Sequence, residues 1–120
     1  MEVFTKIAWA ILALIHLSPA LSAFRPKLIE TLYGISPQGD IGILMTHRGF
    51  LFLAVFVTAI IAIFSLESRK LASIILAISV VSFLFLYAKA GLPTGALRKI
   101  AIVDAVGLFP LAFVIWQSWK

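Results

Sequence analysis

Four long apolar segments, each bounded by charged residues, constrain the fold of this chain more than any other feature. Each has about the 20-residue length that a helix needs to cross the hydrocarbon core of a bilayer. None alternates strictly between apolar and polar residues as a membrane β-strand does, and lipid offers no partners for backbone hydrogen bonds. The sequence therefore predicts an all-α integral membrane protein, a four-helix transmembrane bundle forming one domain over residues 1–120. The apolar segments are residues 7–24, 49–66, 71–88 and 100–119. The expected helices cover residues 4–24, 40–66, 71–89 and 98–118.

The composition supports a membrane protein. Hydrophobic residues make up 62% of the chain and charged residues 12%, whereas ordinary soluble domains carry about 25% charged residues. The net charge of +5 comes mostly from residues at segment ends, where Lys and Arg act as membrane anchors. We therefore expect the lipid bilayer as a partner, and no nucleic acid. The absence of cysteine excludes disulfides and thiolate metal sites.

The first segment has one alternative interpretation, a secretory signal, because it ends in the small-residue stretch 20–23. Glu2 and Lys6 make a weak n-region, because the acid offsets the base, and His16 interrupts the apolar core. We therefore expect a retained helix.

Residues 26–33 predict a short helix between the first two membrane segments. Pro26 suits a first helical position and Gly34 suits a C-terminal stop. The apolar residues of this stretch share one face, as in a helix that lies in the membrane interface. We expect it to cover the membrane segments like a lid. The shared face carries Leu28, Ile29, Leu32 and Tyr33.

Four helices joined by short turns place both termini on one side of the membrane. Six Lys and Arg residues lie near the opposite, loop side and four near the termini. The positive-inside rule then favours cytoplasmic loops. If Arg48 and Lys89 serve a binding site, however, they do not count as topology signals, and each side has four Lys and Arg residues. The orientation therefore stays open. The residues on the termini side are Lys6, Arg69, Lys70 and Lys120.

Asp104 is the most unusual residue, because it is an acid inside an apolar segment. A carboxylate at the centre of a membrane helix costs at least roughly 2.5 kcal/mol, which points to a functional site and a charged partner. We expect Arg48 to be that partner. Helical rise places Asp104 about 8 Å and His16 about 13 Å below the loop-side boundary. Together these residues predict a polar funnel, with candidate proton-transfer residues Asp104 and His16 and candidate ligand-binding residues Arg48, His47, Lys89 and Tyr33.

Each candidate also has a structural interpretation. Asp104 and Arg48 are suited to an ion pair that only fastens two helices. His16 is suited to a neutral imidazole bonded to a neighbouring helix. His47, Lys89 and Tyr33 are typical of the membrane interface. Two metal alternatives also arise, a haem between His16 and His47 and a non-haem metal held by these two and Asp104, but the sequence requires no cofactor.

The chain resembles a group of small bacterial membrane proteins of unknown role. The resemblance lies in the stretch from residues 16–20 through 32–34 to 46–48. In overall layout the chain is similar to the DoxX-like proteins, whose better-known members associate with redox complexes in the membrane. The resemblance implies a bacterial inner membrane and either an accessory subunit or a binder of an apolar small molecule, and it carries over no catalytic residue.

Three functions remain open on the sequence. The first is a non-catalytic accessory subunit or binding protein, which offers residues 40–66, rich in phenylalanine, to a membrane protein partner or a second copy. The second is a membrane enzyme that acts by proton transfer on a lipid-like or quinone-like substrate. The third is a small-solute transporter, which four helices form only as an oligomer.

Overall fold

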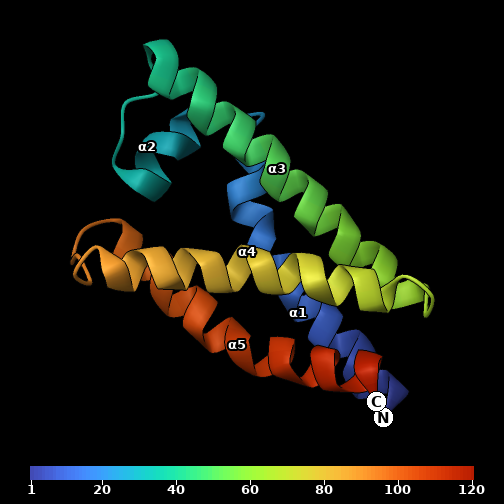
Figure 1. The fold of residues 1–120 in the computed structure, drawn as a ribbon. Coiled ribbons are helices and arrows are strands. Elements are labelled where there is room, and N and C mark those ends of the chain that lie inside the picture. Colours follow the sequence, from blue (N-terminus) through green and yellow to red (C-terminus); the bar gives the residue numbers. More distant parts are fainter.

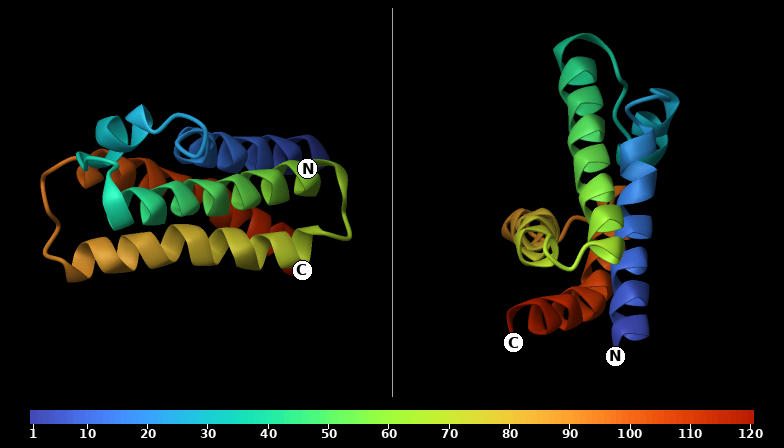
Figure 2. Two further views of the ribbon diagram at one scale, coloured as in Figure 1. Left: turned by 90° about the horizontal axis from the view of Figure 1, so that it is seen from above. Right: turned by 90° about the vertical axis from the view of Figure 1, so that its right-hand side faces the viewer.

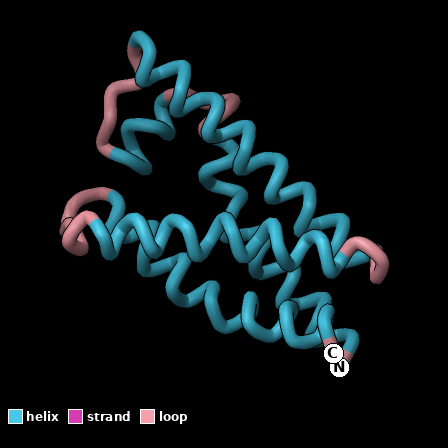
Figure 3. Tube along the Cα trace, in the orientation of Figure 1, coloured by secondary structure: helices cyan, strands magenta, loops and turns pink.

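The protein folds into five helices and no strands, in a computed structural model that describes residues 1–120 (Figures 1 and 3). Four of the helices are long and apolar enough to cross a membrane. This confirms the all-helical fold and fits a multi-pass integral membrane protein, whereas the placement of the short helix at a membrane surface stays a prediction. The helices are α1 (Glu2–Leu21), α2 (Lys27–Tyr33), α3 (Gly39–Phe64), α4 (Arg69–Lys89) and α5 (Leu97–Trp119).

The helix ends follow local chemistry. α1 ends at Leu21, earlier than predicted, because Pro19 lies in its last turn and the next three residues form tight turns, with the Ser22 amide bonded to the Pro19 carbonyl at 3.2 Å. α2 ends where Gly34 adopts a φ of 68°, a left-handed conformation that glycine adopts without strain. These two breaks turn the chain from α1 through α2 into α3.

The long helices form an open V. α1 lies alongside both α3 and α5, and α4 pairs with α5 (Figures 1 and 2). α3 and α4 meet at the short turn that joins them and diverge toward the end where α2 lies (Figure 1). Both chain termini lie at the closed end of the bundle (Figures 1 and 2).

The hydrophobic core occupies the closed half of the V. Trp9 and Leu12 of α1 are fully buried there, against Leu76 of α4 and Val114 of α5. The core residues of α3 are both alanines, which let the helices approach closely. Because this core ends about halfway along the helices, the α2 end is left free for cavities.

A buried arginine fastens the closed end. Arg69, 6% exposed at the start of α4, donates hydrogen bonds to the carbonyls of Ala62 at 2.7 Å and Ile63 at 2.9 Å, and it pairs with both carboxylate oxygens of Glu2 at 3.2 and 2.7 Å. The two carbonyls belong to the last turn of α3, where carbonyl groups have no backbone N–H partner within the helix. Arg69 therefore joins α1, α3 and α4, a role that the sequence did not indicate.

Candidate functional site

Three neighbouring cavities meet at Arg48 in the open half of the V. The α3–α4 cavity has a volume of about 450 Å³ and lies between residues 48–55 and 75–86. The Asp104 cavity, about 240 Å³, is lined by residues from all five helices. The Tyr87 cavity, about 300 Å³, lies between the end of α2, α3, the last turns of α4 and the turn that follows it. Arg48 and Phe83 line all three, so these side chains separate the cavities from one another.

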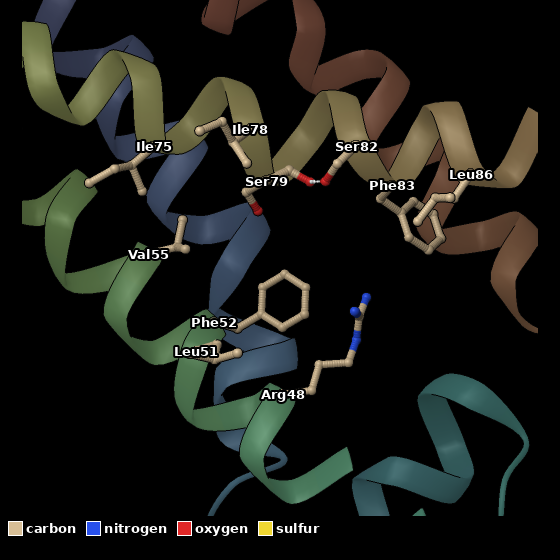
Figure 4. Close-up of a pocket in the computed structure, with 10 residues that line it drawn as sticks. All are labelled: Arg48, Leu51, Phe52, Val55, Ile75, Ile78, Ser79, Ser82, Phe83 and Leu86. Atoms are coloured by element: carbon tan, nitrogen blue, oxygen red, sulfur yellow. Dashed lines mark hydrogen bonds between the residues drawn. The ribbon is translucent and has the colours of Figure 1, made fainter. Parts of the chain in front are cut away.

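The α3–α4 cavity is mostly apolar. The Arg48 side chain extends from α3 into the gap, beside the ring of Phe52, while Ser79 and Ser82 face it from α4 (Figure 4). The remaining lining residues are aliphatic or aromatic. Ile78 lines the cavity and is nevertheless 63% exposed, so the cavity opens on the outer surface between the two helices.

Arg48 does not form the predicted ion pair with Asp104. The two residues line the same cavity, but the only ion pair within 4 Å in the chain joins Arg69 to Glu2. The Arg48 guanidinium carbon instead lies 4.7 Å from the ring centroid of Phe52 and 5.6 Å from that of Tyr33. Two aromatic faces attract the cation and hold it, and it donates no hydrogen bond within the protein.

Asp104 lies half-buried on α5 and faces the Asp104 cavity together with His16, Tyr33 and Lys99. Its carboxylate has no side-chain partner within ion-pair distance. The structure therefore brings together four of the six predicted site residues, Asp104, His16, Arg48 and Tyr33.

His16 is 2% exposed and both of its ring nitrogens are occupied. Nδ1 lies 2.8 Å from the Leu12 carbonyl oxygen, and Nε2 lies 2.9 Å from the Ser79 hydroxyl. Because a carbonyl only accepts, Nδ1 carries the hydrogen, and Nε2 of a neutral ring accepts from the Ser79 hydroxyl. This geometry matches the structural interpretation, in which His16 links α1 to α4; its proton-transfer role stays a prediction.

Replacing Ser79 with alanine is expected to lower the free energy of unfolding by about 0.6–1 kcal/mol, the usual contribution of one hydrogen bond between membrane helices. The variant leaves Nε2 of His16 without a donor. Thermal unfolding in detergent measures the effect. Ser82→Ala is the matched control, since its hydroxyl bonds only to the carbonyl of Ser79 on the same helix, at 3.4 Å. Equal effects of the two variants would contradict the α1–α4 link.

The two other predicted site residues do not join the cavities. His47 and Lys89 are both exposed, and neither lines any of the three. His47 precedes Arg48 directly, so the helical turn of about 100° per residue points it elsewhere. His16, His47 and Asp104 do not gather into a group that could hold a metal ion, so the metal alternative built on these three residues is wrong.

An aromatic residue, Phe52, and a basic residue, Lys99, complete the site without having been predicted from the sequence. Phe52 lies about one helical turn after Arg48, and Lys99 lies about one and a half turns before Asp104. Residues four apart share a helix face. Phe52 follows Arg48 by four residues, and Phe83 follows Ser79 by four, so this spacing could have identified both phenylalanines as part of the lining.

No protein-family model, curated protein or solved structure matches the chain. The resemblance to DoxX-like proteins therefore stays a prediction. The geometry around Arg48 is what distinguishes between possible functions.

Proposed function

We propose that the chain is a small multi-pass membrane protein that binds an apolar small molecule with one polar end, without catalysis, in the cavities around Arg48. One observation carries this proposal: the Arg48 guanidinium borders three cavities and has no ion pair or hydrogen bond within the protein. A cation inside a membrane segment is costly unless it gains a partner. The aromatic rings supply part of that stabilisation, and a polar ligand group would supply the rest.

The cavities also have the size and lining of a binding site. Small-molecule sites typically have volumes of about 300–1,000 Å³, with apolar walls and a few polar groups that fix the orientation. The α3–α4 cavity fits this description, with a volume of about 450 Å³ and seven hydrophobic residues among the ten that line it.

Binding is favoured over proton transfer. The nitrogens of His16 are both engaged in structural hydrogen bonds, and a general base must lie within hydrogen-bond reach of the proton it takes. Asp104 alone does not complete a set of acid and base.

Mass spectrometry of the native protein in a mild detergent tests the proposal. Wild type is expected to carry one small molecule per chain, and Arg48→Gln is expected to lose most of it, because the polar end loses its charged partner. Arg48→Gln should still fold, since the arginine makes no hydrogen bond to the protein. His47→Gln, a change at the adjacent exposed residue, is the control and should retain the molecule. The proposal fails if wild type carries no adduct, or if the two variants behave alike.

A further inference from the structure

We infer that the bound molecule is an acyl amphiphile with an anionic oxygen head group, a carboxylate or a phosphate, which enters sideways from the bilayer between α3 and α4. This inference rests on the proposed function and names the class of ligand. It follows from the charge around Arg48, from the shape of the α3–α4 cavity and from the side on which that cavity opens.

The surroundings of Arg48 favour an oxyanion. A guanidinium presents several donors in one plane, which match the two oxygens of a carboxylate or phosphate. Tyr33, 7% exposed, lines two of the three cavities beside Arg48, and its hydroxyl has no hydrogen-bond partner in the protein. A phenol can donate to an oxyanion bound at Arg48. Six Lys and Arg residues lie on this side of the chain against three acids, Glu30, Asp40 and Asp104, so the net charge there is positive and also attracts an anion.

The position of Asp104 decides which side of Arg48 receives the head group. Asp104 would repel an anion, and it lines only the Asp104 cavity. The α3–α4 cavity and the Tyr87 cavity contain no acidic residue. The head group therefore lies where these two cavities meet at Arg48, outside the cavity that Asp104 lines.

The α3–α4 cavity has the form required for an acyl chain. Its lining runs over eight residues of α3, 48–55, and twelve residues of α4, 75–86, which correspond to about 12 Å and 18 Å of helix. The two serines in the lining offer no free donor, because Ser79 donates to His16 and Ser82 to a carbonyl of its own helix. An acyl chain can lie along this groove without stranding a polar hydrogen.

The cavity opens toward the bilayer. Three of its apolar lining residues are largely exposed, on both helices that border the gap. Both helices are long and apolar enough to cross a membrane, so the opening between them faces lipid. The three residues are Leu51, Ile78 and Leu86.

Binding of defined probes to delipidated protein tests this inference. Native mass spectrometry in detergent would compare oleate, oleyl alcohol, acetate and a two-chain phosphatidate. Oleate or phosphatidate is expected to bind one per chain, and oleyl alcohol and acetate at least about tenfold more weakly, because each lacks either the charge or the chain. Arg48→Gln should reduce oleate binding by a similar factor. Tighter binding of oleate would identify a free fatty acid as the natural source, and tighter binding of phosphatidate a membrane lipid.

Two variants with matched exposure locate the acyl chain. Ile78→Trp places a large ring in the α3–α4 opening and is expected to weaken oleate binding by about tenfold or more. Leu71→Trp, on the same helix, changes a residue that is 64% exposed against 63% for Ile78 but lines none of the three cavities. It should bind oleate like wild type.

The possible outcomes separate this inference from the function on which it rests. If none of the probes binds although the native protein carries a small molecule that Arg48→Gln loses, the acyl class is wrong and the proposed function stands. If oleyl alcohol binds as tightly as oleate and Arg48→Gln weakens both, the anionic class is wrong, but the proposed function stands because the ligand is still bound through Arg48. Acetate binding as tightly as oleate would remove the acyl chain from the inference. Equal oleate binding by the two tryptophan variants would overturn entry between α3 and α4.

Discussion

Replacing Arg69 with glutamine is expected to lower the free energy of unfolding by about 2–4 kcal/mol, because a buried side chain that makes several charge-assisted hydrogen bonds is lost. Its Nε and Nη2 groups donate to the carbonyls of Ala62 and Ile63. Glutamine is too short to reach these carbonyls from α4, and they would stay buried without donors. Reversible unfolding in detergent, followed by tryptophan fluorescence, measures the loss.

Two neighbouring charges supply the controls. Glu2→Gln removes only the partner of Arg69 that is exposed to solvent, and exposed ion pairs contribute little. Lys70→Gln removes a cation that lies 5.2 Å from the ring of Trp119 and makes no hydrogen bond to α3. Both should be clearly milder than Arg69→Gln. If Glu2→Gln were as damaging, the ion pair rather than the capping of α3 would hold this end together.

We expect the packing at the closed end of the V to affect the width of the α3–α4 cavity at the open end. α3 and α4 are joined by a short turn, which a hydrogen bond between the hydroxyls of Ser65 and Ser68 at 2.9 Å also supports. Arg69 fixes the angle between the two helices at this point, and the same angle sets the width of the α3–α4 cavity at the other end. A variant weakened at Arg69 should therefore also bind the probe amphiphiles less tightly.

The fold could be predicted from the sequence to the extent that hydrophobic length determines it. Lipid forces backbone groups to bond within a helix, so four long apolar segments lead to four long helices. The angles between these helices depend instead on which side chains meet in the core, where α3 contributes the small residues Ala59 and Ala62. Helical periodicity does not reveal which small residues meet, so the V shape was not predicted.

The site could be predicted only in part. Helical rise gives the depth of a residue, and depth was enough to place His16, Arg48 and Asp104 near one another. It does not give the direction of a long side chain, and the Arg48 cation turned toward two aromatic rings rather than toward Asp104. Arg69 could not be predicted for a related reason. A charge at a helix start has the same sequence signature whether it anchors the helix in lipid head groups or caps a neighbouring helix.

Gly49 is a position where a single added carbon should be strongly destabilising. A Cβ atom there would lie 2.7 Å from both the backbone nitrogen of Ala23 and the hydroxyl of Ser22, and 3.1 Å from the Ala23 Cα. Ser22 is fully buried and bonded to the Pro19 carbonyl, so it cannot move aside, and backbone atoms cannot rotate away. The contact is thus a point where the backbones of α3 and the end of α1 touch.

Gly49→Val is accordingly expected to lower the free energy of unfolding by about 3 kcal/mol, and Gly49→Ala by somewhat less, because overpacking costs about 1–3 kcal/mol while alanine regains up to about 1 kcal/mol of helix propensity. Gly107→Ala is the matched control on α5, where the added carbon would meet only the terminal carbon of the Ile15 side chain, which can rotate. Since Gly49 follows Arg48, the displaced helix should also carry the guanidinium away from Tyr33 and weaken oleate binding in the folded fraction. Melting temperatures in detergent that fall equally for Gly49→Ala and Gly107→Ala would show that the two helices separate freely at this contact and that it does not position Arg48.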